Sequence, residues 1–305
     1  MRIIISTVSH NHYDMIAKLN SLAQLAKHED ITVICRDNVG DSRLREYCFR
    51  NEIIYIQNRY PCGYAVNNNL NFVYYNENLH PRDDDYFVLF NPDVELAPTT
   101  IHELRKSLAE KPQGILAGNL YLDENYTTTD DNIRRYPRLY QFAKTYLLGN
   151  RSTMIDRKDG LPEDGRYWAS GAFIAICTKL YKKLGGLDER YYMYCEDIDF
   201  CYRASKAGIP VKLVEDVKAI HWRQRDSKKM FSRFFVWHVS SVLRYCFSRK
   251  KVAAKRSQLY VATRNQMVKP IVPAQIIVQQ KRATIESKDL KRNRVMDELL
   301  EREAC

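Results

Sequence analysis

The chain has 305 residues, of which 45% are hydrophobic and 28% are charged, so it can bury a substantial core and is not a disordered polymer. Its eight cysteines form no C-x-x-C pair, which argues against a zinc site and favours reduced thiols over a disulfide framework. The apolar run at the N-terminus is too short for a signal peptide, so we expect a cytoplasmic protein.

The net charge of +11 is distributed unevenly along the chain. Residues 228–305 contain 18 Lys and Arg against 6 Asp and Glu, whereas the residues before them are close to neutral. We therefore predict two parts, a globular domain over residues 1–227 and a basic helical extension over residues 228–305. Such an extension favours an anionic partner, either a membrane surface or nucleic acid.

Strand and helix patterns alternate through the first 90 residues. Apolar, β-branched runs predict strands at 2–8, 31–35, 52–56 and 86–90, and helical spacing predicts helices over 15–25 and 64–78. This order is typical of an α/β fold with a parallel sheet, whose ligands bind at the carboxyl ends of the strands. Polar residues follow three strands, at Asp37, Asn58 and Asn91-Pro92-Asp93. We expect the functional site at that edge.

The pattern continues less regularly to residue 221. It predicts strands at 113–122 and 166–177, a polar loop at 123–132, a helix near 139–148, a helix at 197–207 ended by Gly208, and two short strands at 211–214 and 217–221.

The strand-end sequence Asn91-Pro92-Asp93 is a candidate metal site. A carboxylate there can hold Mg²⁺ or Mn²⁺, which would neutralise the charge of a leaving diphosphate. The same residues also favour a simple turn. His221, which ends an apolar run, is by itself more typical of a structural histidine, although a neutral imidazole is a suitable second ligand beside Asp93.

The acidic sequence Glu196-Asp197 at a predicted helix start is a candidate catalytic site. A carboxylate can take the proton of an attacking hydroxyl, and Tyr191, Tyr192 and Tyr194 before it offer stacking surfaces for sugars. Acidic residues at a helix N-terminus also simply complement the helix dipole.

Taken in order, the motifs resemble glycosyltransferase family 2, and the resemblance covers roughly residues 2–222. Within the family, the chain is most similar to bacterial rhamnosyltransferases that extend N-acetylglucosaminyl-diphospho-undecaprenol in O-antigen assembly. The motifs that carry the resemblance are Ser6-Thr7-Val8-Ser9-His10-Asn11, Val33-Ile-Cys-Arg-Asp-Asn38, Gly63-Tyr-Ala-Val-Asn-Asn-Asn69, Asp83-Asp-Asp-Tyr86, Leu89-Phe-Asn-Pro-Asp93, Ser170-Gly-Ala-Phe173, Gly185-Gly-Leu-Asp188, Tyr192-Met-Tyr-Cys-Glu-Asp-Ile-Asp199 and His221.

The resemblance implies a GT-A fold, a Rossmann-like nucleotide-binding sheet with helices on both faces, and it implies a role for each matching residue. Asp197 would be the catalytic base, with Glu196 positioning the base or the acceptor. Asp93 and His221 would bind Mg²⁺ or Mn²⁺. Asn91 stands where the family often has Asp, which leaves one carboxylate for the metal. The residues implied at the nucleotide sugar are Thr7, Ser9, Asp37, Asn67 and Asn91, and those implied under the acceptor are Trp168, Ser170 and Gly171.

The activity implied is an inverting transfer of L-rhamnose from dTDP-β-L-rhamnose to a polyprenyl-diphosphate-linked GlcNAc, at the cytoplasmic face of the bacterial inner membrane. Alternatives are a family 2 transferase using a UDP-hexose or UDP-galactofuranose donor, and a non-catalytic membrane or nucleic-acid adaptor. A nucleotidyltransferase is disfavoured because Ser9-His10-Asn11-His12 is not a Gly-rich, basic phosphate loop.

The basic segment from 228 to 251 is predicted to lie on a membrane rather than cross it. Arg233 and Arg244 would cost about 5–7 kcal/mol in a span, more than the roughly 3–5 kcal/mol returned by its apolar residues. An interfacial helix instead places Phe231, Phe234, Phe235, His238, Val242 and Tyr245 on one side.

The alternative is that this helix packs on the preceding domain and the rest of the tail is solvated. No nucleic-acid motif is present, so nucleic acid is not an expected partner. Residues 288–303 could form an amphipathic helix for self-association.

Overall fold

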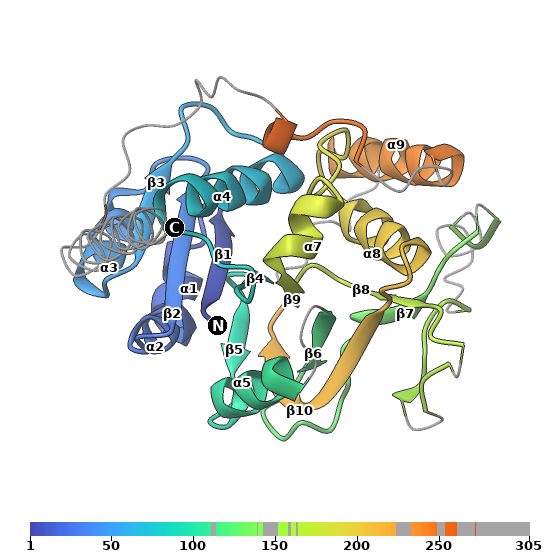
Figure 1. Ribbon diagram of the computed structural model, residues 1–305, viewed down its shortest axis with the longest axis horizontal. Helices are drawn as coiled ribbons and strands as arrows, with labels where there is room; N and C mark the ends of the chain where they lie inside the picture. The colour runs from blue at the N-terminus through green and yellow to red at the C-terminus, as the bar shows by residue number, and fades with distance from the viewer. Residues whose placement is uncertain are drawn as a thin grey trace, which may run out of the picture.

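The computed structural model describes residues 1–110, 114–138, 140–142, 152–157, 160–162, 164–223, 233–248, 254–260 and 272. They form a mixed eight-stranded sheet, in the order β3-β2-β1-β4-β9-β6-β10-β5, and a two-stranded sheet of β7 and β8 (Figure 1). The strands are β1 (Ile3–Ser9), β2 (Ile31–Asp37), β3 (Ile54–Gln57), β4 (Tyr86–Phe90), β5 (Val94–Leu96), β6 (Ile115–Tyr121), β7 (Ile133–Arg135), β8 (Tyr167–Ala169), β9 (Phe173–Cys177) and β10 (Val211–His221). The helices are α1 (Tyr13–Leu19), α2 (Ser21–Ala26), α3 (Ser42–Arg50), α4 (Tyr64–Asn78), α5 (Thr100–Glu110), α7 (Thr178–Lys183), α8 (Glu196–Lys206), α9 (Arg233–Ser248) and the 3₁₀ turn η3 (Gln258–Tyr260).

The first four strands make the parallel half of the sheet that the sequence predicts. They are parallel, and the strand order reverses between β1 and β4, so a ligand crevice is expected beyond the carboxyl ends of these two strands. Helices α4 and α7 pack on one face, where Phe72 and Tyr181 contact Phe87 of β4 at ring-centroid distances of 5.2 and 5.0 Å. Because β1 and β4 are buried on both faces, their sequences are apolar rather than alternating.

Three elements differ from the predictions. The predicted strand at 166–177 is two strands, β8 and β9, in different sheets. Because β9 runs antiparallel to β4 and β6, the sheet is mixed rather than parallel. The two predicted closing strands are one strand, β10, with a register shift between Val214 and Lys218. The predicted helix at 15–25 divides into α1 and α2 at Asn20, whose φ is 57°. Gly171 lies at the first of these breaks, whereas neither Gly nor Pro marks the other two.

Other elements were not predicted at all, or lie outside the described residues. Helices α3, α5 and α7 and the short strands β5 and β7 were not predicted, although α3 and α5 each bury apolar residues four positions apart, Leu44 with Cys48 and Leu104 with Leu108. Of the predicted helix near 139–148, only residues 140–142 are described, and the predicted helix at 288–303 lies outside the described residues.

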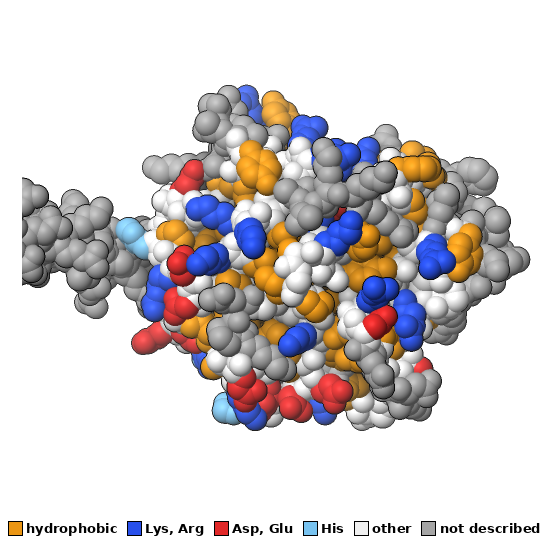
Figure 2. Space-filling model, turned by 45° about the vertical axis from the view of Figure 1, so that its right-hand side comes forward, with side chains coloured by type: hydrophobic (Ala, Val, Ile, Leu, Met, Phe, Trp, Pro, Cys, Tyr) orange, Lys and Arg blue, Asp and Glu red, His pale blue; other side chains and the backbone are white. Residues whose placement is uncertain are grey.

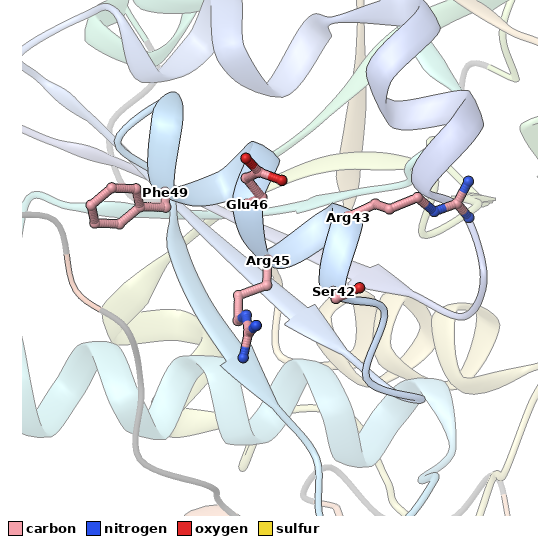
Figure 3. Close-up of a pocket in the computed structure, with 5 residues that line it drawn as sticks. All are labelled: Ser42, Arg43, Arg45, Glu46 and Phe49. Carbon is pink, nitrogen blue, oxygen red and sulfur yellow. The ribbon is translucent and has the colours of Figure 1, made fainter.

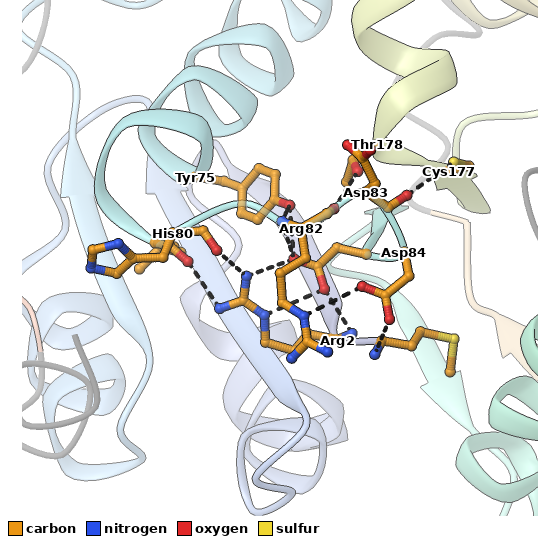
Figure 4. Close-up of polar contacts among 11 residues, drawn as sticks. Arg2, Tyr75, His80, Arg82, Asp83, Asp84, Cys177 and Thr178 are labelled. Atoms are coloured by element: carbon orange, nitrogen blue, oxygen red, sulfur yellow. Dashed lines mark hydrogen bonds and ion pairs between the residues drawn. The ribbon is translucent and has the colours of Figure 1, made fainter. Parts of the chain in front are cut away.

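The acidic sequence before β4 is structural. Asp85 is fully buried and accepts hydrogen bonds from the backbone N–H and the guanidinium of Arg2, at 2.8 and 2.6 Å, and from the hydroxyl of Tyr75, at 2.9 Å. Figure 4 shows Arg2 and Tyr75 converging there beside Arg82. This cluster ties β1, α4 and β4 together at the amino ends of the strands, the edge opposite to the predicted site.

Helix α9 packs against the α/β domain. Tyr245 is 1% exposed, and the Tyr194 and His238 rings lie 4.9 Å apart. The prediction that His238, Val242 and Tyr245 face a membrane is therefore wrong, because this side of the helix is covered by the domain. The side chains of Phe231, Phe234 and Phe235 lie outside the described residues. No described helix has both the length and the apolar character needed to cross a bilayer.

Candidate active site

Three of the side chains predicted at the nucleotide, Thr7, Ser9 and Asp37, lie at the carboxyl ends of β1 and β2 and are buried. Thr7 donates to the carbonyl oxygen of Phe90 at 2.8 Å, and the hydroxyl of Ser9 accepts from the backbone N–H of His12 at 3.2 Å. Asp37 accepts from the N–H groups of residues 39, 40 and 41 and from the Tyr55 hydroxyl. These side chains are already hydrogen-bonded within the protein, and their direct contact with a nucleotide stays a prediction.

Asn67 belongs to a buried network of amides under the loop before α4. Its side-chain amide donates to Asn38 and to the carbonyl oxygen of Cys62, and its oxygen accepts from Asn58 at 2.6 Å. The side-chain oxygen of Asn38 also accepts from the backbone N–H of Cys62 at 2.7 Å. Asn38, which the sequence analysis did not single out, thus joins the end of β2 to the loop at 58–62. Asn67 supports this loop and is itself inaccessible.

Asp93 and His221 come together at the carboxyl edge. Strand β5, which follows Asp93, runs antiparallel to β10 and pairs Val94 with His221. The backbone N–H of Trp222 donates to the carbonyl oxygen of Asp93 at 3.0 Å. As a result, Nε2 of His221 lies 3.4 Å from Oδ1 of Asp93, with both side chains largely buried.

This pair suits a divalent cation, because carboxylate oxygen and imidazole nitrogen are both ligands of such metals. Among the described residues, no group of three or more His, Cys, Asp or Glu side chains is arranged to hold a metal. A metal at Asp93 and His221 would therefore need ligand oxygens and water to complete its coordination.

The turn from Ser170 to Ala172, between β8 and β9, joins the two halves of the site. The carbonyl oxygen of Ala172 accepts a hydrogen bond from the backbone N–H of Asn91 at 2.9 Å, two residues before Asp93. The backbone N–H of Gly171 donates to Oδ2 of Asp197 at 3.1 Å. One short turn therefore contacts both the Asn91–Asp93 strand end and the predicted base.

The predicted acceptor residues belong to this turn and the strand before it. Ser170 Oγ is buried without a hydrogen-bond partner among the described residues, which leaves its hydroxyl for a ligand. The hydroxyl of Tyr64 donates to the carbonyl oxygen of Gly171 at 2.8 Å, and a Cβ at Gly171 would lie 3.1 Å from that hydroxyl oxygen. Trp168 is largely buried, and its indole N–H donates to the carbonyl oxygen of Arg135 at 3.2 Å, so it holds the strand that leads into the turn.

The two carboxylates at the start of α8 have different surroundings. Asp197 is half-buried and accepts from the backbone N–H groups of Gly171 and Ile198, at 3.1 and 2.8 Å. Glu196 is 6% exposed, and its Oε2 has no hydrogen-bond partner among the described residues. Burial, reinforced by the charge of Asp197, raises the pKa of Glu196 well above its usual value. Burial also raises the pKa of Asp197, but the N–H groups of Gly171 and Ile198 oppose that shift.

The loop before these carboxylates is strained. Tyr194 and Cys195 have φ values of 71° and 65°, a region that costs non-glycine residues about 1–3 kcal/mol each. The loop is held from both sides: the carbonyl oxygen of Tyr192 accepts from the backbone N–H of Tyr64 at 3.0 Å, and the hydroxyl of Ser241 in α9 donates to the carbonyl oxygen of Met193 at 2.9 Å. Strain of this kind is frequent at functional sites.

Asp199, next in the acidic sequence, has a structural role. It pairs with Arg203 one turn later at 2.8 Å, and Arg203 donates to the carbonyl oxygens of Leu184 and Gly186. Gly186 has a φ of +68°, and a Cβ there would meet Asn69 at 2.3 Å. The Gly185-Gly186 motif is therefore needed for the packing of α4 and α8.

A hollow of about 350 Å³ on α3 lies away from this site (Figure 3). It is lined by Ser42, Arg43, Arg45, Glu46 and Phe49. Helix α3 packs on β3, at the outer edge of the sheet, and two of the lining side chains are already in ion pairs, Arg43 with Asp41 and Glu46 with Arg50. We find no reactive chemistry in this hollow.

Two functional candidates escaped the sequence analysis. Asp130, in the polar loop after β6, contacts His221. Burial raises the pKa of Asp197, and the charge of Arg134 in β7 opposes this rise. The only sequence signal for either is the polar composition around residues 123–135, which by itself predicts a surface loop.

The chain is similar in sequence and in fold to known glycosyltransferases. No protein-family model matches the chain. It is 32% identical to the rhamnosyltransferase WbbL of Escherichia coli (strain K12) over 256 residues, 84% of this chain and 96% of that protein. It is 30% identical to the N-acetylglucosaminyl-diphospho-decaprenol L-rhamnosyltransferase of Mycobacterium tuberculosis over 148 residues, 46% of this chain and 48% of that protein.

Among solved structures, GalNAc-T7 with UDP, GalNAc and Mn²⁺ superposes with a TM-score of 0.54 at 12% identity, covering 80% of this chain and 47% of that one. This likeness concerns the GT-A fold. The identity to WbbL extends over nearly all of that protein, and together with the fold it shows that the chain belongs to glycosyltransferase family 2 and is an enzyme of its rhamnosyltransferase group.

Proposed function

We propose that the enzyme transfers L-rhamnose from dTDP-β-L-rhamnose to GlcNAc-diphospho-undecaprenol, with inversion at the anomeric carbon. The names of the relatives support rhamnose and a lipid-linked GlcNAc acceptor. The observation that carries the proposal is the turn from Ser170 to Ala172, which hydrogen-bonds to the base on one side and to the Asn91–Asp93 strand end on the other. Donor and acceptor would meet across this turn.

Asp197 takes the proton of the acceptor hydroxyl as the hydroxyl oxygen attacks the anomeric carbon. Its carboxylate is held by two backbone N–H groups, which favour the charged form that a base requires. Glu196 is a poorer base, because burial keeps it protonated to higher pH. As a neutral acid, Glu196 can donate a hydrogen bond to the acceptor or to Asp197, and Ser170 Oγ offers a second contact to the acceptor sugar.

Asp93 and His221 would hold Mg²⁺ or Mn²⁺ against the donor diphosphate. When bound, such an ion neutralises the charge that develops on the departing nucleoside diphosphate. The Mn²⁺ and UDP in the GalNAc-T7 structure support this assignment for the shared fold. The protein supplies one carboxylate and one imidazole, so we expect the donor phosphates to contribute strongly to metal affinity.

The nucleotide would lie over the ends of β1 and β2. Thr7, Ser9, Asp37 and Asn67 form the buried base of this crevice, and Asn91 stands partly exposed at its edge. The preference for dTDP over UDP rests on the relatives alone, because both pyrimidines fit the same kind of pocket.

Helix α9 would bind the enzyme to the cytoplasmic face of the inner membrane, through the side opposite to the one predicted. Its outer side carries an apolar stripe of Val236, Val239, Leu243 and Phe247, whose exposed fractions range from 38% to 78%. The stripe lines a shallow groove of about 540 Å³ together with Ser240 and Arg244.

Charge supports an anionic lipid surface as the occupant of this stripe. Residues 228–305, which include α9, contribute the excess of basic over acidic residues in the chain. On the face seen in Figure 2, basic side chains are spread among exposed hydrophobic ones, while most acidic side chains lie along the left and lower margins. The contacts of α9 with Met193 and Tyr194 would bring a membrane-bound acceptor close to Asp197.

A donor screen tests the function. dTDP-rhamnose, UDP-hexoses and UDP-galactofuranose are offered to the full chain with a GlcNAc-diphospholipid, and the linkage of the product is read by NMR. We expect transfer from dTDP-rhamnose, and Asp197→Asn should lower turnover by about 10²–10⁴-fold while donor binding persists. If only a UDP-sugar were transferred, that sugar would replace rhamnose in the proposed function. Failure to bind any nucleotide would favour a non-catalytic adaptor protein.

A further inference from the structure

Asp130 contacts His221 on the side of the imidazole ring away from Asp93. Its carboxylate is 1% exposed, and Oδ2 lies 2.6 Å from Nδ1 of His221. The other ring nitrogen, Nε2, faces Oδ1 of Asp93 at 3.4 Å. The imidazole of His221 is thus placed between two carboxylates, each beside a different nitrogen.

The backbone of Asp130 is held by hydrogen bonds to other parts of the chain. Its N–H donates to the carbonyl oxygen of Leu120 at 2.8 Å, and its own carbonyl oxygen accepts from the guanidinium of Arg157 at 2.6 Å. Arg157 also donates to the side-chain oxygen of Asn132. The second carboxylate oxygen of Asp130 forms an ion pair with Arg223. This set of contacts holds the carboxylate in one position against the imidazole.

We propose that Asp130 is a positioning residue that accepts Nδ1–H of His221 and so keeps the lone pair of Nε2 directed toward Asp93 and a divalent cation. The proposal rests on the metal site of the proposed function. Metal-binding histidines commonly donate their other N–H to a carboxylate, which fixes both the tautomer and the orientation of the ring. Nε2 and the Asp93 oxygen are both electron-pair donors in this tautomer, and their proximity is favourable when a cation lies between them.

The alternative is that Asp130 only stabilises the end of β10. The two possibilities differ in one property. A stabilising ion pair would change the folding stability and leave cation affinity alone in the folded protein, whereas a positioning residue sets the affinity for the cation directly. Asp130→Asn separates them, since the amide can donate through its NH₂ group and thereby favour the tautomer with a proton on Nε2.

The test is Mn²⁺ binding to the full chain, read as free Mn²⁺ by EPR, with Mn²⁺ alone and again with dTDP. We expect Asp130→Asn to weaken binding by about 10–100-fold. Asp131→Asn is the matched control, because Asp131 is the neighbouring aspartate and also lies beside Arg223, at 3.6 Å, while it pairs with Arg134 at 3.7 Å. It should bind Mn²⁺ as the unmodified chain does. Equal affinity of Asp130→Asn and the unmodified chain would overturn the proposal.

A second measurement covers the case in which Asp130→Asn does not fold. In the unmodified chain with Mg²⁺, ¹⁵N-histidine NMR should show His221 protonated at Nδ1 only, with the signals identified by their loss in His221→Gln. Protonation at Nε2 instead would refute the positioning role. Failure of the donor screen would leave both of these measurements unaffected. Absence of Mn²⁺ binding by the unmodified chain would refute this proposal and the metal assignment, but it would not refute the sugar transfer itself.

Discussion

The hydroxyl of Ser241, on the inner side of α9, donates a hydrogen bond of 2.9 Å to the carbonyl oxygen of Met193, three residues before Glu196. This contact joins helix α9 to the strained loop that precedes Glu196 and Asp197, the carboxylates to which we assign catalysis. Helix α9 therefore has two functions to separate: support of the loop through its inner side, and membrane binding, as we propose, through its outer side.

Ser241→Ala should weaken the support of this loop. Loss of the hydrogen bond is expected to cost about 1 kcal/mol of unfolding free energy and to lower kcat, because the left-handed Tyr194 and Cys195 are less firmly held. Ser240→Ala is the matched control, since Ser240 is exposed on the outer side. Thermal unfolding and turnover of both variants check this, and equal kcat for the two would refute a role for Ser241 in positioning the loop.

The pH dependence of sugar transfer should follow the protonation of the Asp197 carboxylate. Burial raises its pKa above the ordinary 3.8, so activity is lost as pH falls through this raised value and the base becomes protonated. We expect the acidic limb of kcat/KM to lie above the usual range of an aspartate. The profile is measured with a lipid-linked acceptor. An acidic limb at or below the ordinary value would contradict the assignment of Asp197 in its buried setting.

Glu196→Gln should change the pH dependence of stability. The pKa of Glu196 is raised by burial in the folded protein, so the neutral acid stabilises the fold fully below its unfolded value of about 4.5, and this contribution is lost as pH rises through the folded value. Glutamine remains neutral at all pH values. The melting temperature of Glu196→Gln should therefore rise relative to the unmodified chain as pH increases above 4.5, and a constant difference would contradict the shift.

Phe247→Glu should reduce binding to anionic vesicles. Phe247 is 78% exposed on the outer side of α9, and burying a phenylalanine in an apolar phase contributes about 1.5–3 kcal/mol. We expect at least tenfold weaker partitioning, since about 1.4 kcal/mol corresponds to a factor of ten. The measurement is co-sedimentation with vesicles containing phosphatidylglycerol.

Phe49→Glu is the matched control for this experiment, because Phe49 is 65% exposed on α3, outside the proposed membrane face. It should sediment as the unmodified chain does. Equal loss in both variants, or none in Phe247→Glu, would argue against the outer side of α9 as the lipid-binding surface.

Much of the fold follows from local sequence. The buried strands β1 and β4 are continuous apolar runs, and α4 begins and ends where its pattern predicts. The break between β8 and β9 was not predicted although Gly171 lies in it, because the apolar residues on both sides of this turn do not indicate that the chain passes from one sheet to the other.

The sequence by itself determined the α/β class, the carboxyl edge as the place of the site, and the identity of Asp93, Glu196, Asp197 and His221 as candidates, because these depend on short motifs and strand ends. Only the tertiary structure decided which side chains meet. The pairing of Val94 with His221 brings Asp93 and His221 together, and Asp130 contacts His221 from a different loop. Likewise, α9 has apolar residues on two sides, and packing against the α/β domain decided which side is covered. Contacts between distant segments depend on strand order and register, which local periodicity does not contain.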